Sequence, residues 1–231
     1  MQTSAQKRTR AFFGRRKGHP LRRHQSALFE TLLPPIAIDT DKPATADPRS
    51  LFAPGMTEVR VEIGFGGSEH LIAQAQAHPD IGFIGSDGFV NAIGKALAAI
   101  ERNLLANIRL HHGDAAHLLE WLPAGAIARI DLLYPDPWPK RRHWKRRFVQ
   151  DETLAQFARI LRTGGEFRFA TDIADYADWT LARILRSPDF DWMAKIADDW
   201  RKPWPGYVRT RYEAKALREG RTPAYFIFRR K

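Results

Sequence analysis

The amino-acid sequence predicts an α/β fold in which a mostly parallel sheet carries helices on both faces. Segments with the pattern of a buried strand alternate with segments of helical periodicity from residue 57 to the end of the chain. This alternation is typical of parallel sheets because each helix returns the chain to the start of the next strand. The length of 231 residues suits one such domain with a tail.

The expected elements follow one another in a regular order. Strands are expected at 58–65, 81–87, 107–114, 128–137, 165–172, 190–197 and 222–230. Helices are expected at 66–78, 89–105, about 145–161 and 173–186. The second of these is the clearest, because apolar residues recur at spacings of three and four at Phe89, Ile93, Leu97, Ile100 and Leu104. Gly164 and Gly165 are expected to introduce the fifth strand.

Three parts are expected along the chain: a basic, mobile N-terminal arm over 1–25, a short helix and linker over 26–56, and a single domain over 57–231. The arm holds eight Lys and Arg residues, and no acidic residue precedes Glu30, so the arm supplies +8 of the net charge of +11. Such a segment is suited to pairing with phosphates. The alternative is a disordered tail that only keeps the chain soluble.

The composition excludes several classes of site and partner. The chain has no cysteine, which excludes disulfides, zinc–thiolate sites and cysteine nucleophiles. The excess of 37 Lys and Arg over 26 Asp and Glu favours an anionic partner, nucleic acid before a membrane surface. No apolar run approaches the roughly 18–20 residues that span a bilayer, and no secretory signal is present, so a cytoplasmic location is expected. The spacing of His111, His112 and His117 suits no metal site, and no protein partner is evident.

Residues 62–70 read EIGFGGSEH and form a strand, a glycine turn and the start of a helix. Gly64 and Gly66 allow a ligand to approach the backbone closely. The dinucleotide fingerprint would need a third glycine where Glu69 stands, which argues against a pyrophosphate ligand. Glu62 instead suits a cationic group, and S-adenosylmethionine carries both an ammonium and a sulfonium.

Two further acidic residues end strands of the predicted sheet. Asp87 ends the second strand, where a carboxylate can accept hydrogen bonds from both ribose hydroxyls. Asp114 ends the third strand, in a position to accept from an adenine amino group. Either residue alone is as easily explained as a helix N-cap. Three acids that end three successive strands favour a binding site instead.

The stretch PDPWPKRRHWKRR, residues 135–147, resembles the signature of the tRNA (guanine-N7-)-methyltransferase family. The likeness covers nearly the whole chain from about Phe13, with further blocks in the expected order: GRRKG (14–18), EIGFGGSEHL (62–71), NIRLHHGDA (107–115), GGEFRFATDIADY (164–176) and TRYEAKAL (210–217). The sequence departs from the family at Asp87, where Glu is usual, and at Tyr134, where Phe is common.

The resemblance implies a Rossmann-like, seven-stranded methyltransferase sheet whose last strand is antiparallel. It also implies a site that binds S-adenosylmethionine through Glu62, Gly64, Gly66, Asp87, Asp114 and Asp136. Asp136 is in addition the implied catalytic carboxylate. The resemblance further implies that the guanine lies in a loop outside the paired stems, the variable loop of the tRNA. The implied contacts of the guanine region are Lys140, Asp172, Thr210, Arg211, Tyr212 and Glu213.

The chemistry of guanine N7 fits these residues. N7 carries an in-plane lone pair and no proton, so methyl transfer to it needs alignment and no general base. A carboxylate that accepts from guanine N1–H and the 2-amino group would hold the base and stabilise the positive charge of the product. We assign this role to Asp136 or Asp172. The prolines around Asp136 would restrict its backbone.

The basic run after Asp136 is expected to contact tRNA phosphates through Lys140, Arg141, Arg142, Lys145, Arg146 and Arg147. Trp138 and Trp144 could stack on a base, although packing within the protein is the better expectation for Trp138.

Two other functions compete with this hypothesis. An amino-methyltransferase acting on adenine or cytosine would carry Asp/Asn-Pro-Pro-aromatic, whereas the order here is Asp-Pro-Trp-Pro. An RNA-binding module that had lost its activity would have no need to keep all five of the pocket residues Glu62, Gly64, Gly66, Asp114 and Asp136.

Overall fold

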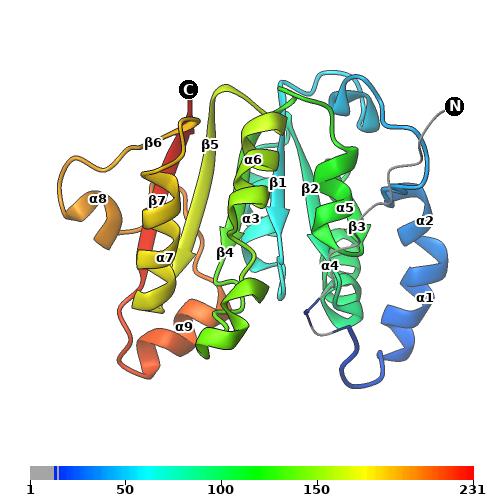
Figure 1. Ribbon diagram of the computed structural model, residues 1–231. Coiled ribbons are helices and arrows are strands. Elements are labelled where there is room, and N and C mark those ends of the chain that lie inside the picture. Colours follow the sequence, from blue (N-terminus) through cyan, green and yellow to red (C-terminus); the bar gives the residue numbers. More distant parts are fainter. Residues whose placement is uncertain (1–12, 15) are drawn as a thin grey trace, which may run out of the picture.

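The computed structural model describes residues 13–14 and 16–231, which form a seven-stranded sheet between two layers of helices (Figure 1). The strand order is β3-β2-β1-β4-β5-β7-β6. Neighbouring strands are parallel except at β7, which is antiparallel to both β5 and β6. The strands are β1 (Glu58–Ile63), β2 (Ile81–Asp87), β3 (Ile108–His112), β4 (Ile127–Leu133), β5 (Leu161–Thr171), β6 (Phe190–Trp192) and β7 (Ala224–Arg230). The predicted fold class, including the antiparallel last strand, is confirmed.

Helices α5, α6 and α7 pack on one face of the sheet, α3 and α4 pack on the other, and α1 packs against α4. The helices are α1 (Arg23–Thr31), α2 (Leu33–Ile36), α3 (Glu69–Ala77), α4 (Val90–Asn103), α5 (Ala115–Trp121), α6 (Asp151–Ile160), α7 (Ala174–Ile184), α8 (Asp198–Arg201) and α9 (Arg211–Arg218), with 3₁₀ turns η1 (Pro48–Leu51) and η2 (Arg141–Arg146). Within the described part of the chain, no helix has the length and apolar character needed to cross a membrane.

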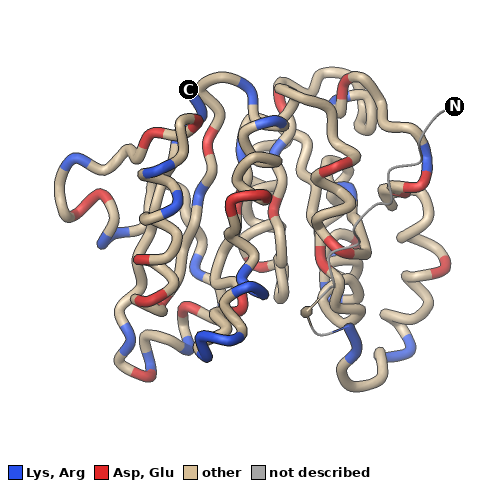
Figure 2. Tube along the Cα trace, in the orientation of Figure 1, with Lys and Arg blue, Asp and Glu red and all other residues tan. Residues whose placement is uncertain are grey.

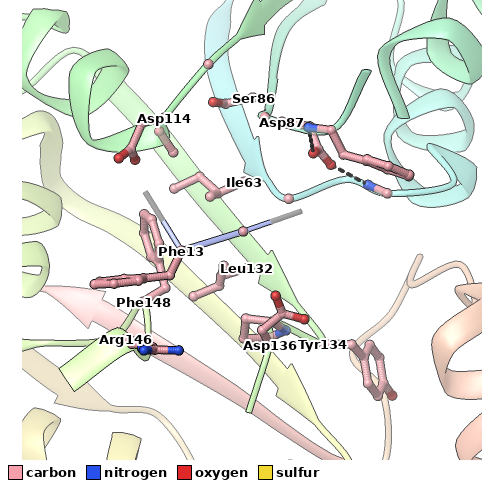
Figure 3. A pocket seen from close by; sticks show the side chains of 18 of the residues that line it. Phe13, Ile63, Ser86, Asp87, Asp114, Leu132, Tyr134, Asp136, Arg146 and Phe148 are labelled. Atoms are coloured by element: carbon pink, nitrogen blue, oxygen red, sulfur yellow. Dashed lines mark hydrogen bonds between the residues drawn. The ribbon is translucent and has the colours of Figure 1, made fainter. Parts of the chain in front are cut away.

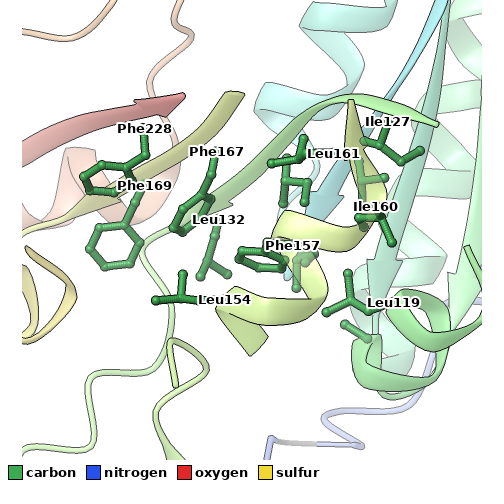
Figure 4. Close-up of a cluster of buried hydrophobic side chains, with 14 of the residues drawn as sticks. Leu119, Ile127, Leu132, Leu154, Phe157, Ile160, Leu161, Phe167, Phe169 and Phe228 are labelled. Carbon is green, nitrogen blue, oxygen red and sulfur yellow. The ribbon is translucent and has the colours of Figure 1, made fainter. Parts of the chain in front are cut away.

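Aliphatic side chains and a group of phenylalanines fill the largest of the three hydrophobic clusters among the described residues (Figure 4). Phe157 of α6 packs 4.8 Å from Phe167 of β5, measured between ring centroids, and Phe167 lies 5.5 Å from Phe228 of β7. All three side chains are fully buried. Burial of each contributes about 1.5–3 kcal/mol to stability. The core therefore fastens the antiparallel β7 to the parallel part of the sheet.

The helix expected over about 145–161 begins later than the apolar spacing suggests. The chain forms the 3₁₀ turn η2 and then extends at Arg147, so that α6 starts only at Asp151. The start is set by a capping box between Gln150 and Thr153, in which the Gln150 N–H donates to the Thr153 hydroxyl at 2.8 Å.

Other differences also have local causes. Strand β5 begins at Leu161, before the two glycines, because Leu161 pairs with Ile127 and the register then shifts near Gly164, whose φ is +78°. Strand β6 ends at Trp192, five residues earlier than expected. Helices α5 and α9, which begin after the N-caps Asp114 and Thr210, were not predicted from the sequence.

The predicted N-terminal arm falls largely on residues 1–12 and 15, which lie outside the described residues. Its last residues contact α4. The Val90 N–H donates to the Arg16 carbonyl at 3.0 Å, and the Gly18 N–H donates to Asn91 Oδ1 at 3.0 Å. A Cβ on Gly18 would come within 2.8 Å of the Phe89 ring, so only glycine fits this contact. Helix α1 already begins at Arg23.

Candidate functional site

A cavity of about 350 Å³ opens at the carboxyl edge of the sheet, next to the ends of β1, β2, β3 and β4 (Figure 3). This is the edge at which ligands of open α/β sheets bind. The sequence-predicted residues that line the cavity are Gly64, Gly66, Asp87, Asp114, Asp136 and Tyr212. The sequence-predicted residues outside its lining are Glu62, Lys140, Asp172, Thr210, Arg211 and Glu213.

The glycine turn after β1 presents its backbone to this cavity. Gly64 and Gly66 have φ values of +70° and +52°, a region that L side chains rarely adopt. A Cβ on Gly64 would meet no atom within 4 Å, whereas one on Gly66 would come 2.9 Å from the Tyr212 ring. The first glycine thus borders open space, and the second permits the close approach of α9.

Asp87 stabilises that turn from the end of β2. Its two carboxylate oxygens accept hydrogen bonds from the Gly66 N–H at 2.9 Å and the Phe89 N–H at 2.8 Å. Burial raises the pKa of Asp87, although these hydrogen bonds oppose the shift. Each oxygen keeps a further lone pair for a ligand hydroxyl.

Asp114 serves both as a helix cap and as part of the cavity wall. Its Oδ1 accepts from the Ala116 N–H at 3.0 Å and so begins α5. Its Oδ2 has no partner among the described residues and can accept from a ligand. The N-cap and binding interpretations of this residue are therefore compatible.

Glu62 lies beneath the glycine turn rather than in the cavity. It is buried, and its Oε2 lies 2.8 Å from Nδ1 of His70 on α3. Across the sheet it is in register with Asp131 of β4, which accepts from Arg129 at 2.8 Å. Burial raises the pKa of Glu62, and the contact with His70 partly opposes that shift.

Asp136 sits in a loop with unusual backbone geometry. Tyr134 and Trp138, two residues to either side, have φ values of +50° and +45°. Non-glycine residues in this region cost of order 1 kcal/mol or more each, so packing must hold the loop. The Asp136 carboxylate has no hydrogen-bonding partner among the described residues, and it lines the cavity. Desolvation by the surrounding atoms raises the pKa of Asp136.

Arg147 provides the packing beneath this loop. Its side chain is 0% exposed, and its Nε donates to the Pro137 carbonyl at 2.9 Å. Its guanidinium also pairs with the Asp175 carboxylate and lies 4.9–5.0 Å from the ring centroids of Trp144, Tyr176 and Trp179. The expectation that Arg147 contacts tRNA phosphates is therefore wrong, because the whole side chain is enclosed.

An aromatic stack that the sequence analysis did not predict closes one side of the cavity. The guanidinium of Arg146 lies 5.0 Å from the ring centroids of both Phe13 and Trp138. The two rings meet edge to face, with centroids 6.5 Å apart. Trp138 is thus packed within the protein, as expected. Phe13 is 49 residues or more from the glycine and acidic motifs, and nothing in the local pattern marks it as a wall of the cavity.

The other cavity residues that were not predicted from the sequence fall mainly into two groups. Several lie at the end of a strand or directly after it at the carboxyl edge, where the topology alone could have identified them: Ser86, Gly88, Gly113, Tyr134 and Pro135. Others supply apolar walls from within strands or loops: Ile63, Leu132, Phe89 and Phe148.

The predicted tRNA contacts are found in different environments. Lys140 is exposed at the start of η2, and Tyr212 is exposed on α9. The Asp172 carboxylate accepts from Arg221 and is mostly shielded from solvent. Thr210 and Glu213 are buried, and the Thr210 hydroxyl accepts from the Glu213 N–H at 3.2 Å.

Lys and Arg residues gather along η2 and α9 at the lower edge of the view in Figure 2. The strand ends that border the cavity point toward the same edge. The exposed cations in these two segments and just before them are Lys140, Arg141, Arg142, Lys145, Arg209, Lys215 and Arg218. A surface with this charge favours the approach of a polyanion.

Comparison with solved structures supports the fold. The structure aligns with "16S rRNA Methyltranferase KamB" at a TM-score of 0.53 and 14% identity, covering 82% of this chain and 94% of that chain. It also aligns with TrmN from Thermus thermophilus at a TM-score of 0.52 and 19% identity, covering 77% of this chain and 45% of that chain.

Comparison of sequences identifies the family. Residues 56–225 match the family profile described as "Putative methyltransferase". The tRNA (guanine-N(7)-)-methyltransferase of Rhodopseudomonas palustris is 60% identical over 220 residues, which cover 95% of this chain and 83% of the relative. That of Bradyrhizobium diazoefficiens is 58% identical over 221 residues, which cover 96% of this chain and 94% of the relative. The chain therefore belongs to the tRNA (guanine-N(7)-)-methyltransferase family.

Proposed function

We propose that this protein transfers the methyl group of S-adenosylmethionine to N7 of a guanine in tRNA, with Asp136 as the catalytic carboxylate. The observation that carries the proposal is the position of Asp136. Its unpaired carboxylate shares one cavity with Gly64, Asp87 and Asp114. This arrangement supports a cofactor site with a guanine-binding acid beside it.

The cavity suits S-adenosylmethionine in volume and chemistry. About 350 Å³ lies within the range of small-molecule sites, and the lining combines apolar side chains with a few oxygen acceptors. Asp87 would accept from the ribose hydroxyls, Asp114 from the adenine amino group, and the open backbone at Gly64 would border the amino-acid part. Glu62 would attract the cationic groups of the cofactor from beneath the turn rather than from the cavity wall, since its side chain is bonded to His70. When bound, S-adenosylmethionine supplies an electrophilic methyl carbon whose bond to sulfur breaks with the electron pair leaving on sulfur.

Asp136 is better placed than Asp172 to hold the guanine. Asp172 is paired with Arg221 and does not line the cavity. Asp136 is free to accept from N1–H and the 2-amino group, which orients N7 and offsets the charge that develops as N7 gains the methyl group. Adenine offers neither donor, so the same carboxylate discriminates against it.

The tRNA would be held by the exposed cations of η2 and α9. Lys140 follows the catalytic loop directly, and Arg211 and Tyr212 lie beside the glycine turn. Contacts to phosphates provide affinity and register without reading the base, so these residues position the RNA while Asp136 selects guanine.

The reaction is tested by incubating the purified chain with S-adenosylmethionine and unmodified bulk tRNA. Nucleoside mass spectrometry is expected to detect 7-methylguanosine, and fragment mapping to assign it to a loop outside the paired stems. Calorimetry with S-adenosylhomocysteine should give a binding heat. An RNA-binding module would retain tRNA and give neither result.

Cofactor affinity is expected to fall as the pH is lowered. The fall should begin at a pH above the ordinary Asp pKa of about 3.9. Burial raises the pKa of Asp87, and the protonated acid loses much of its capacity to accept from the ribose and from the turn. Calorimetry with S-adenosylhomocysteine at successively lower pH, from about pH 8 down to the ordinary Asp range, should show a rising Kd. Asp87→Asn, which carries no titrating proton, should flatten this step. An identical pH dependence in both proteins would exclude Asp87 as its source.

A further inference from the structure

We infer that Glu213 is a positioning residue that fixes α9 against the cofactor side of the site, and that it does not contact the tRNA. That α9 borders a cofactor site rests on the proposed function. That Glu213 holds α9 in place rests on the contacts in the structure. The family resemblance implied a substrate contact here, but the side chain is only 2% exposed.

Both oxygens of the Glu213 carboxylate already accept hydrogen bonds from phenols. The Tyr225 hydroxyl donates to Oε1 at 2.7 Å, and the Tyr207 hydroxyl donates to Oε2. The exposed Arg209 lies 3.5 Å from Oε1 and offsets the charge. The carboxylate is therefore satisfied within the protein and has no exposed surface to offer a base.

The two tyrosines tie α9 to separate parts of the fold. Tyr225 belongs to β7, and Tyr207 belongs to the segment that precedes α9. Their rings pack at a centroid distance of 5.5 Å, and Trp204 packs edge-on against both. Glu213 is thus the polar centre of an otherwise aromatic cluster, where removal of its oxygens leaves two buried donors unsatisfied.

The same segment is also attached to the floor of the cofactor site. The Tyr207 ring packs 5.7 Å from the ring of His70, the partner of Glu62. One residue earlier, the Gly206 carbonyl accepts from Gln74 Nε2 at 2.8 Å. Gln74 Oε1 in turn accepts from Arg129 of β4 at 2.8 Å. A continuous set of buried contacts therefore runs from β1, β4 and α3 to Glu213.

The neighbour of Glu213 on α9 shows what this attachment positions. Tyr212 lines the cavity, and its ring is so close to Gly66 that a Cβ there would come within 2.9 Å. Loss of the Glu213 contacts would free α9 to move and would withdraw Tyr212 from the glycine turn. The cavity would then lose one wall. The exposed cations of α9 would no longer be held at a fixed position relative to Asp136.

The test compares Glu213→Gln with Glu213→Ala, because the amide keeps the shape of the side chain. One tyrosine can still donate to the amide oxygen, and the other can accept from the amide N–H₂. A direct contact with guanine through two acceptors would be lost in both variants. We expect the Gln variant to keep Kd for S-adenosylhomocysteine and kcat/KM for tRNA within about threefold of wild type, and the Ala variant to lose about tenfold or more in each.

The phenols provide a second test. Tyr207→Phe/Tyr225→Phe should reproduce the Ala losses, and adding Glu213→Ala to it should cause little further loss, because all three side chains act through one contact. Asp178→Ala, an exposed acid on α7, serves as the control. A Gln variant as impaired as the Ala variant, or a double Phe variant equal to wild type, would overturn the inference. Binding of S-adenosylhomocysteine reports on Glu213 even if the wild-type protein made no 7-methylguanosine. Failure of the proposed function can therefore be distinguished from failure of this inference.

Discussion

Asp136→Asn is expected to lower kcat for guanine methylation by about 100- to 1,000-fold, the range found when one preorganised electrostatic contact to a transition state is removed. Asparagine keeps the size of the side chain. It removes the negative charge that offsets the positive charge developing on guanine, and it turns one acceptor for the base into a donor. The raised pKa of Asp136 gives a second signature, because kcat in the wild-type enzyme should fall as the carboxyl is protonated.

Binding measurements separate this effect from a general loss of structure. Asp136 is not bonded to any described residue, so the variant should fold as stably as wild type. Its affinity for tRNA should change little, since the exposed cations of η2 and α9 are intact. Asp178→Asn on the surface of α7 is the matched control and should keep full activity. Turnover by Asp136→Asn close to that of wild type would remove Asp136 from the mechanism.

Arg147→Leu is expected to cost roughly 2–4 kcal/mol in the free energy of unfolding, as is usual when a buried charged hydrogen-bond network is broken. The substitution removes the donor to the Pro137 carbonyl and the partner of Asp175. It also removes a planar cation from between three aromatic rings. Because Pro137 is adjacent to Asp136, kcat should fall together with stability.

Urea unfolding and steady-state kinetics measure the two effects. Arg142→Leu is the matched control, since Arg142 is exposed on η2 and its replacement should change stability by no more than about 0.5 kcal/mol. Arg147→Lys should resemble Arg147→Leu more than wild type, because an ammonium cannot reproduce the planar geometry of the guanidinium. An Arg147→Leu protein as stable as Arg142→Leu would show that the buried contacts contribute nothing to the catalytic loop.

Residues with local signals were predicted well. Strand β2 was predicted at its observed bounds, and α4 within one residue at its start and two at its end. Both have a periodicity that depends only on nearby residues. Asp87 and Asp114 were placed at the cavity because the ends of parallel strands meet at one edge.

Residues whose environment depends on distant parts of the chain were not predicted. Arg147 belongs to a run of exposed cations and is nevertheless fully buried. The sequence pattern does not reveal that three aromatic rings and a proline carbonyl converge on its position. Glu62 and Glu213 were expected to meet ligands, yet each carboxylate is bonded within the protein. Phe13 reaches the cavity only because the segment after it is held on α4.

The sequence by itself determined the alternation of strands and helices, the acids at the carboxyl edge of the sheet and the likeness to one family. These properties follow from local periodicity, chain direction and motif spacing. The tertiary structure decided which charged side chains are available to ligands and which hold the site together. That distinction depends on burial and on partners far away in the chain. A carboxylate or guanidinium enclosed by such partners stabilises the fold, and the same group left unpaired at the cavity is free to act on a substrate.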